Sequence, residues 1–302
     1  MVMSDLPNGR ALAKAYLVEQ DDLYAVNQRV CALTPYRDCA EYLYYYLNRN
    51  PYFLQFDDGV NQTHLLNQVF QKCPVVLPRE VAEQRAIAAA LSDVDALLDG
   101  LTRLIAKKRD LKQGAMQQLL TGQTRLPGFR GEWEVKRLGE VLTICHGKSQ
   151  HHVVVADGLY PILATGGQIG TASRPLYDKP SVLIGRKGTI DQPKYMETPF
   201  WTVDTLFYSA MTGRNSAKFF YYRFCLIDWM RFNEASGVPS LNARTIERIE
   251  IMSPGPTEQT AIATVLSDMD AELSALEARR TKTRLLEQAM MQELLTGRTR
   301  LV

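Results

Sequence analysis

Three glycine-containing loops carry side chains that could hydrogen-bond to the edges of nucleic-acid bases. The candidate residues are Thr165, Gly166, Gly167 and Gln168 in the first loop, Arg186 and Lys187 in the second, and Ser236, Gly237, Asn242 and Arg244 in or just after the third. Glycine permits close approach of the backbone, threonine and glutamine can bond to bases, and arginine can contact guanine through two hydrogen bonds. Turn chemistry alone, however, favours an ordinary hairpin turn in each place.

The charge distribution is the second feature that bears on nucleic-acid binding. The chain of 302 residues has a formal charge of +2, which excludes an indiscriminately basic protein. Residues 127–256 carry 15 basic and 12 acidic side chains, whereas residues 1–80 carry 7 and 9. The surplus is concentrated between residues 136 and 194, which include Lys148, and we therefore add Lys148 to the candidates. An ordinary solvated surface explains so small a surplus more readily when it is taken alone.

Motifs for enzyme chemistry fail when their spacing is checked. Gly147, Lys148 and Ser149 are similar to the end of a phosphate-binding loop, but Leu142 stands where that motif needs its first glycine. The neighbouring cysteine and histidines have no second ligand pair at a zinc-site spacing. The sequence also lacks the G-x-S-x-G, H-E-x-x-H and Asp/Asn-Pro-Pro-Tyr patterns. We therefore expect no catalytic residue, no metal ligand and no cofactor site in this chain.

Composition predicts a folded protein of the cytoplasm. Hydrophobic residues make up 46% of the chain, which is enough to bury a core. No apolar run approaches the roughly 18–20 residues of a membrane-spanning helix, and no secretory signal is visible at the N-terminus. The five cysteines are widely spaced and form no C-x-x-C, so we expect no disulfide framework.

A long internal repeat organises the chain that must position these loops. Residues 83–126 and 258–301 are identical at 25 of 44 positions at a constant offset of 175. Each copy has apolar residues at heptad spacing, which predicts a helix of about 38 residues that packs against another helix. The expected packing residues are Ile87, Leu91, Val94, Leu98 and Leu101 in the first copy and Ile262, Leu266, Met269, Leu273 and Leu276 in the second.

Each of the two predicted helices has a stripe of apolar side chains along one face, so we expect them to pack together in antiparallel order. Beyond Leu276 the strict heptad lapses, and Leu286, Met290 and Leu294 are expected to continue the stripe of the second helix. The alternative is that each helix packs on its own globular segment. Together with the short strand-like runs between them, the helices predict an α+β fold: globular domains of mixed sheet and helix joined by two long antiparallel, coiled-coil-like helices.

The repeat extends weakly into the globular segments and shows that they are unequal. The aromatic run at 218–226 parallels the run at 41–49, and the segment at 200–211 parallels 23–34. The first segment matches the second only from about residue 180 onward, so we expect it to lack the counterpart of roughly residues 127–180. The predicted boundaries are 1–80 for a partial first domain, 81–126 for a helix, 127–256 for a complete second domain and 257–302 for a second helix.

This architecture resembles the specificity (S) subunit of type I restriction–modification systems. The resemblance rests on E-Q-x-x-I-A…L-S-D-x-D and Q-x-L-L-T-G-x-T-R-L in both helices, on P-G-F-R-G-E-W-E-V-K-R-L-G-E-V at 127–141, and on three further segments. These are Y-P-I-L-A-T-G-G-Q-I-G at 160–170, V-L-I-G-R-K-G-T-I at 182–190 and S-G-V-P-S-L-N at 236–242.

The resemblance implies a non-catalytic subunit in which each of two recognition domains reads one half of a bipartite site in double-stranded DNA. It implies that the helices dock modification subunits, that a motor–nuclease subunit joins indirectly, and that S-adenosylmethionine, ATP and magnesium belong to those partners. The resemblance also favours DNA contacts over plain turns in the first two loops.

The incomplete first domain departs from the family pattern and leaves two expectations open. A subunit with one complete domain could associate with a second copy of itself. Alternatively, the chain could be a coiled-coil scaffold or inactive remnant that binds partner subunits without reading DNA.

Overall fold

The computed structural model describes residues 1–4, 11–18, 20, 23–27, 30–35, 37–57, 65 and 67–301. They form two compact units: unit 1 comprises residues 1–105 and 275–302, and unit 2 comprises residues 106–274. Each unit therefore contains one globular segment together with parts of both long helices. The four predicted segment boundaries remain a prediction, because the structural division falls inside the helices.

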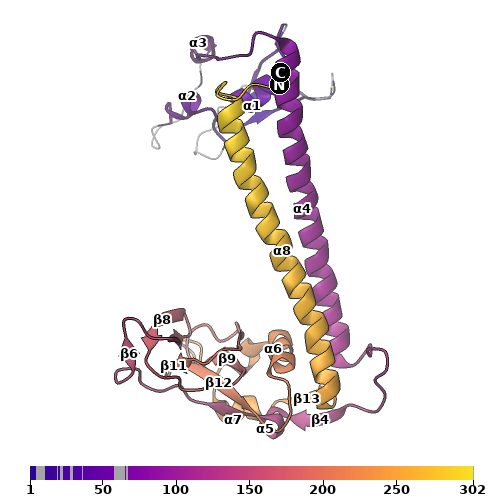
Figure 1. Cartoon of the computed structure of the whole chain (residues 1–302), viewed down its shortest axis with the longest axis vertical. Helices are drawn as coiled ribbons and strands as arrows, with labels where there is room; N and C mark the ends of the chain where they lie inside the picture. Colours follow the sequence, from indigo (N-terminus) through magenta and orange to yellow (C-terminus); the bar gives the residue numbers. More distant parts are fainter. Residues whose placement is uncertain are drawn as a thin grey trace. The chain divides into compact units, whose positions relative to one another are not determined.

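The two long helices are α4 (Val81–Thr121) and α8 (Pro256–Leu294), which lie side by side in antiparallel order (Figure 1). In unit 1, Ile87 and Leu91 near the start of α4 share a buried cluster with Leu294 at the end of α8. In unit 2, Met116 near the end of α4 shares a cluster with Ile262 near the start of α8. The α+β fold class with long helices, predicted from the heptads and the strand-like runs, is confirmed.

Most of the predicted packing positions on the helices are buried. The fully buried residues among them are Ile87, Leu91, Leu98, Leu101, Ile262, Leu266 and Leu273, while Val94, Met269 and Leu276 are half-buried. The expected continuation of the stripe through Leu286 is wrong, because Leu286 is 54% exposed. Thr283, at the heptad position, is buried instead, and its hydroxyl donates to the carbonyl of Arg279 at 2.9 Å.

Unit 2 is built on two four-stranded sheets. The first has the order β10-β9-β12-β5 and is antiparallel; the second has the order β11-β7-β8-β6. The strands are β5 (Leu142–Cys145), β6 (Val154–Val155), β7 (Tyr160–Ala164), β8 (Gly167–Ala172), β9 (Ser181–Gly185), β10 (Lys194–Met196), β11 (Trp201–Thr202) and β12 (Leu206–Met211). A separate ribbon pairs β4 (Glu134–Arg137) with β13 (Glu250–Ser253).

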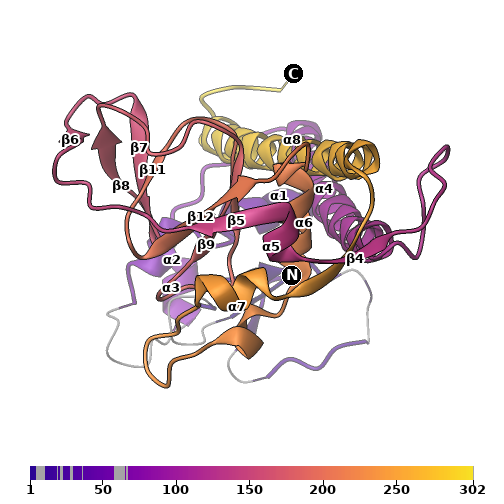
Figure 2. The same cartoon turned by 90° about the horizontal axis from the view of Figure 1, so that it is seen from below.

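Helices pack on the first sheet of unit 2 and close its core. They are α5 (Leu138–Val141), α6 (Ala217–Leu226), the short 3-10 helix η1 (Trp229–Phe232) and α7 (Ala243–Glu247). Figure 2 shows β5, β9 and β12 gathered beside α6. The aromatic residues of α6, including Phe219 and Phe220, are buried in a cluster that continues to the end of α4 and the start of α8. The long helices are thereby part of the core that supports the loops of unit 2.

Unit 1 repeats part of this plan with fewer elements. Its sheet has the order β2-β1-β3, from β1 (Val2–Ser4), β2 (Ala15–Tyr16) and β3 (Val30–Ala32), and its short helices are α1 (Ala40–Leu47), α2 (Pro51–Leu54) and α3 (Asn67–Gln71). By sequence repeat and antiparallel pairing, β1 corresponds to β9 in unit 2, β2 to β10 and β3 to β12. No described strand of unit 1 corresponds to β5.

Equivalent polar contacts attach the aromatic helix of each unit to the long helices. In unit 1, Gln84 accepts a hydrogen bond from the backbone N–H of Cys39 at 2.8 Å. In unit 2, its repeat counterpart Gln259 accepts from the backbone N–H of Ser216 at 2.9 Å. The same correspondence holds for the hydroxyl donors Tyr45 to Asp95 and Tyr222 to Asp270, each at 2.7 Å. These buried and half-buried polar contacts fix the register between the aromatic helix and its long helix.

The ends of the long helices are joined by two equivalent ion pairs. Arg125, just past the end of α4, contacts Glu258 at the start of α8 at 2.6 Å. Arg300, just past the end of α8, contacts Glu83 at the start of α4 at 2.5 Å. Both arginines bind the carboxylate through two nitrogens, the geometry that gives such pairs their specificity. Within the part of the chain that the structure describes, no helix is long and apolar enough to cross a membrane.

Candidate nucleic-acid interface

The first two candidate loops of unit 2 meet at the backbone carbonyl of Thr205, between β11 and β12. The hydroxyl of Thr165, in the turn between β7 and β8, donates to this carbonyl at 2.5 Å. The backbone N–H groups of Arg186 and Lys187, after β9, donate to the same oxygen at 2.8 and 3.3 Å. One acceptor thus fixes the first loop against the second, although about 20 residues separate them in sequence.

The third loop pairs with the second as a short antiparallel segment. The N–H of Leu241 donates to the carbonyl of Arg186, and the N–H of Gly188 donates to the carbonyl of Pro239, both at 2.9 Å. The tip of the third loop, including Ser236 and Gly237, is exposed. Asn233 closes the base of this tip, because its carboxamide oxygen accepts from the N–H groups of Ala235 at 3.1 Å and Ser240 at 2.9 Å. The loop tip therefore projects from a rigid base.

Close packing at the second loop explains its leading glycine. A Cβ atom at Gly185 would lie 2.1 Å from the carbonyl oxygen of Thr189 and 3.0 Å from the methyl group of Thr165. Real side chains do not approach this closely, so glycine is required for β9 to turn here beneath the first loop.

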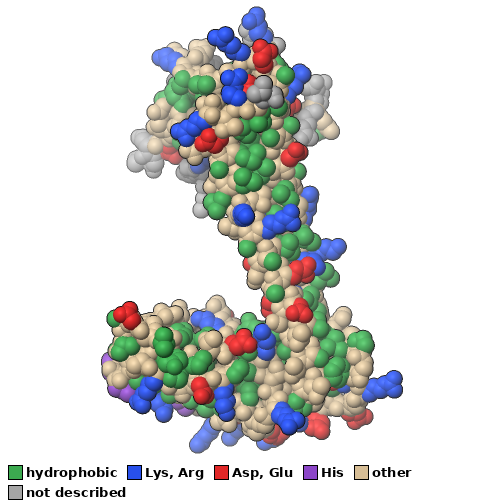
Figure 3. All heavy atoms as spheres, in the orientation of Figure 1, with side chains coloured by type: hydrophobic (Ala, Val, Ile, Leu, Met, Phe, Trp, Pro, Cys, Tyr) green, Lys and Arg blue, Asp and Glu red, His purple; other side chains and the backbone are tan. Residues whose placement is uncertain are grey.

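A hollow of about 380 Å³ opens where the second and third loops meet. It is lined by four of the predicted residues, which are Arg186, Lys187, Asn242 and Arg244, and by His146, Phe207, Glu234, Ser240, Leu241 and Ala243. Three of the lining side chains are cationic and one is an anion. Figure 3 shows lysine and arginine side chains along the lower rim of unit 2, with histidine side chains at its end. The hollow is thus a polar recess with a local basic surplus.

The polar side chains around this hollow differ in how far they are already engaged. The guanidinium of Arg186 donates to the backbone carbonyl of Asp204 at 3.2 Å and lies 3.7 Å from its carboxylate. The side chain of Asn242 caps α7 by accepting from the N–H of Arg244 at 2.9 Å. Lys187 and Arg244 are exposed. The lysine and Arg244 are therefore the side chains that can reach a ligand without breaking a contact.

The remaining predicted residues lie beside the hollow rather than in it. Gln168 is exposed at the start of β8, and its amide donates to the carbonyl of Gly170 at 3.2 Å. Lys148 is exposed, while its backbone is fixed by a 2.8 Å bond to the carbonyl of Thr202 and a 2.9 Å bond from the indole of Trp201. The structure therefore brings Arg186, Lys187, Asn242 and Arg244 together and leaves the first loop and Lys148 as flanking positions.

Two side chains beside the hollow, Cys145 and Tyr208, have pKa values raised above their ordinary values. Burial raises the pKa of the Cys145 thiol, so it stays protonated and is a poor nucleophile at neutral pH. Burial and the neighbouring thiol raise the pKa of Tyr208 to about 12. Within the ranges that the structure describes, no three histidine, cysteine or acidic side chains are grouped so that they could hold a metal ion.

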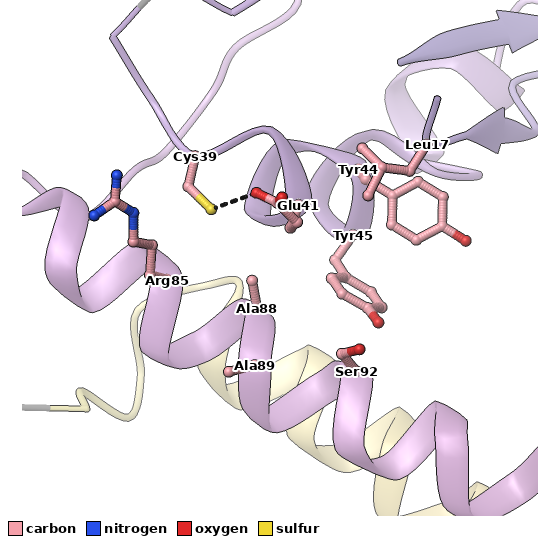
Figure 4. A pocket seen from close by; sticks show the side chains of 9 residues that line it. All are labelled: Leu17, Cys39, Glu41, Tyr44, Tyr45, Arg85, Ala88, Ala89 and Ser92. Carbon is pink, nitrogen blue, oxygen red and sulfur yellow. Dashed lines mark hydrogen bonds between the residues drawn. The ribbon is translucent and has the colours of Figure 1, made fainter. Parts of the chain in front are cut away.

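Unit 1 has a hollow of its own, between α1 and α4 (Figure 4). It measures about 350 Å³ and is lined by Leu17, Cys39, Glu41, Tyr44, Tyr45, Arg85, Ala88, Ala89 and Ser92. The thiol of Cys39 donates to the carboxylate of Glu41 at 3.1 Å. Burial raises the pKa of this thiol, and the same hydrogen bond lowers the pKa of Glu41. The Cys39 thiol in this hollow is therefore held in its protonated form rather than as a thiolate.

Several residues that shape the interface have no sequence signal. Thr205 acts through its carbonyl, Asn233 closes a loop, and His146 and Glu234 reach the hollow from other elements. Asp204 follows a strand-like run, but nothing in its spacing indicates that it contacts Arg186. These roles depend on tertiary proximity.

Comparison with known proteins identifies the family of this arrangement. A family model described as the type I restriction modification DNA specificity domain matches residues 12–109 and 130–287. The chain belongs to this type I specificity family. The resemblance inferred from the repeated helix motifs and the recognition-domain segments is therefore confirmed.

Individual relatives of the type I specificity family match shorter parts of the chain. The chain is 30% identical over 117 residues to the MjaVIII specificity subunit of Methanocaldococcus jannaschii, covering 35% of this chain and 27% of the relative. It is 22% identical over 148 residues to the EcoDI specificity subunit of Escherichia coli, covering 49% and 33%. The matches thus span about a third or less of these relatives. Both are named as specificity subunits.

A solved structure shares the fold. The S subunit of a type I restriction–modification system from M. genitalium aligns with a TM-score of 0.62 and 18% identity, over 84% of this chain and 72% of that chain. At this identity the likeness concerns the fold alone.

Proposed function

We propose that this chain is the non-catalytic, DNA-recognising specificity subunit of a type I restriction–modification complex, and that unit 2 reads one half-site. The observation that carries the proposal is that three loops are held together beside a hollow that presents Lys187 and Arg244: the first and second are joined at the carbonyl of Thr205, and the third pairs with the second. Cationic side chains position a protein on DNA phosphates, and polar side chains at base edges supply sequence preference. Rigid loops with exposed tips are suited to enter a groove.

Arg186 is the residue we assign to base reading. Its guanidinium is one-third exposed and is oriented by the backbone and carboxylate of Asp204. An arginine held in one direction can present two N–H groups to guanine with less loss of side-chain entropy than a free one. The exposed side chains of Lys187 and Arg244 are assigned to phosphates, where an unrestrained cation is sufficient.

The long helices are assigned to the assembly of the complex. Their mutual packing and end-to-end ion pairs give a stable element on which modification subunits can dock, and the motor–nuclease subunit would join through them. S-adenosylmethionine, ATP and magnesium are assigned to those partners, and the cytoplasm is the expected compartment. The predicted roles of Ser236, Gly237, Gln168 and Lys148 in DNA contact belong to this proposal as well.

The test compares DNA binding by the complex assembled with its modification subunits. Arg186→Ala should weaken binding to the specific site by about 1–3 kcal/mol, which is roughly 5- to 150-fold, with little effect on unrelated DNA. Lys187→Ala should weaken binding to all sequences alike and reduce the slope of log K against log salt by about 0.9. Arg231→Ala is the matched control, because Arg231 is exposed and pairs locally with Asp228 at 2.9 Å.

Unchanged affinity and sequence preference in the Arg186 variant would remove that residue from the reading surface. If neither variant changed DNA binding while modification subunits still bound the chain, the scaffold alternative would replace DNA recognition. A map of methylated adenines in the host genome gives an independent check, since deletion of the gene should erase one bipartite motif.

A further inference from the structure

One carboxylate lies among the cations of the hollow between the second and third loops. Glu234 is exposed and is the one acidic side chain in the lining, beside Arg186, Lys187 and Arg244. An anion at this place repels the phosphates that the cations attract, so it weakens binding to DNA of any sequence. Glu234 is therefore unfavourable for phosphate contact and needs a different explanation.

The carboxylate of Glu234 is oriented from two sides. The N–H of Glu234 donates to the carbonyl of Ser240 at 3.0 Å, which fixes its backbone at the base of the third loop. The hydroxyl of Thr245, in α7, donates to the carboxylate oxygen Oε1. A side chain held in this way loses less conformational entropy when it meets a ligand than a free one does.

The second oxygen of this carboxylate is available to a ligand. In the part of the chain that the structure describes, no group donates a hydrogen bond to Oε2 of Glu234, and no cationic side chain forms an ion pair with it. The carboxylate of Asp204, by contrast, lies 3.7 Å from the guanidinium of Arg186. Closure of the third loop belongs to the neighbouring Asn233, whose carboxamide oxygen accepts two backbone N–H groups. Glu234 thus presents an oriented acceptor to a molecule that enters the hollow.

The hydrogen-bond donors of double-stranded DNA decide which base this acceptor can bind. In the major groove, the donors on the base edges are the amino groups of cytosine and adenine. The amino group of adenine lies beside N7, an acceptor that would repel the carboxylate, whereas cytosine offers the donor alone. Guanine and thymine present acceptors there, which would also repel a carboxylate. A carboxylate therefore favours cytosine over the other three bases.

We propose that Glu234 reads the amino group of one cytosine in the half-site of unit 2. The carboxylate oxygen Oε2 accepts a hydrogen bond from that amino group in the major groove, while Lys187 and Arg244 contact phosphates. Repulsion between the carboxylate and the acceptors of the other bases adds to the preference, as in other interfaces that gain specificity from unfavourable contacts. The proposal rests on the DNA-reading function proposed for unit 2.

Equilibrium binding to altered duplexes tests this assignment on the complex assembled with its modification subunits. The duplexes carry the bipartite motif from the methylation map, with each base pair of the half-site replaced in turn. One position should require cytosine, and replacement of that pair should weaken binding about 5- to 150-fold. N4-methylcytosine at this position should cause a similar loss, because its methyl group takes the place of the donated hydrogen.

Glu234→Ala should abolish this one preference and leave the others in place. Replacement of the cytosine, or its N4-methylation, should then change affinity by less than about twofold, as expected when the contact that the base makes has already been removed. Binding to unrelated DNA should become stronger, because a charge that repels phosphates is gone. A merely structural role of Glu234 predicts the opposite, since a displaced loop would weaken binding to every sequence.

Glu197→Ala is the matched control and should leave every base preference unchanged, because Glu197 is an exposed glutamate of unit 2 that does not line the hollow. The proposal is overturned if Glu234→Ala retains the cytosine preference, if it weakens binding to all sequences alike, or if the base at the affected position is not cytosine. The variants Arg186→Ala and Lys187→Ala separate this failure from that of the proposed function. If they weaken DNA binding as expected, the cytosine assignment alone fails, whereas unchanged binding in both means that DNA recognition fails as well.

Discussion

One repeat position between the long helices carries opposite charges in the two units. In unit 2, Lys112 of α4 forms an ion pair with Asp270 of α8. In unit 1, its repeat counterpart is Glu287 of α8, which faces the carboxylate of Asp95 on α4. We predict that Glu287→Lys converts this carboxyl pair into a second ion pair and stabilises unit 1.

The direction of the effect follows from the pKa of Glu287. Burial and then the hydrogen bond to Asp95 raise this pKa above its ordinary 4.5, and nearby Arg284 opposes the rise only in part. A carboxyl whose pKa is higher in the folded state favours folding when it is protonated, and this contribution is lost as the pH rises through the folded-state pKa. The wild-type chain is therefore penalised at neutral pH, and Glu287→Lys should gain most there.

The expected size is modest because the pair is only half-buried. Removing a like-charge contact and adding an ion pair each contribute a few tenths to 1 kcal/mol, so the variant should gain about 1 kcal/mol. For a chain of this length, that corresponds to a rise in melting temperature of about 2 °C.

Thermal unfolding at two pH values, about 8 and about 4.5, separates this reasoning from a general change in packing. The gain of Glu287→Lys should be present at the higher pH and should shrink at the lower one. The reciprocal variant Lys112→Glu is the matched control and should lower the melting temperature, because it places a second carboxylate against Asp270. An equal gain at both pH values, or a loss from Glu287→Lys, would refute the electrostatic explanation.

Two further predictions compare matched positions in the helices. Both Gly122 and Gly297 have left-handed backbones, with φ of 76° and 72°, so alanine should cost about 1 kcal/mol at each. Gly122→Ala should cost more in thermal unfolding, because its methyl group would lie 3.2 Å from two ring carbons of Trp133; equal losses would show that the ring can move aside at no cost. Leu91→Ala should cost about 2–5 kcal/mol in urea unfolding, whereas Leu97→Ala, at a position 41% exposed, should change stability by less than about 0.5 kcal/mol. Similar losses at both leucines would show that the helix seam has been misplaced.

The sequence was informative where local periodicity decides the structure. Heptad spacing predicted the long helices and most of their buried faces, because a helix that buries one stripe must repeat apolar residues at that interval. It was wrong at Leu286, where Thr283 occupies the buried position. A threonine hydroxyl can bond to the carbonyl one turn earlier within its own helix, so its burial costs little and apolar character alone is a poor guide.

The candidate interface was less predictable, because its geometry comes from contacts between distant segments. Glycines and cations marked the first two loops, and the structure brings Arg186 and Lys187 to the hollow. The role of Thr205 depends on a backbone carbonyl, which every residue has, so side-chain type carries no information about it. The contact between the guanidinium of Arg186 and Asp204 could likewise not be predicted, since neither residue has a spacing that distinguishes it from a solvated charge.

The antiparallel order of the helices has a consequence for synthesis of the chain. The apolar face of α4 is complete at residue 121, but the residues at the end of α8 that cover its first turns are complete only at residue 295, 174 residues later. At about 5–20 residues per second, synthesis of these 174 residues takes roughly 9–35 s. Until then Ile87 and Leu91 lack their contacts with Leu294 and Leu295. During that interval the nascent chain exposes a seam that chaperones or a co-expressed partner could bind. The unit that begins the sequence is therefore the last to be completed.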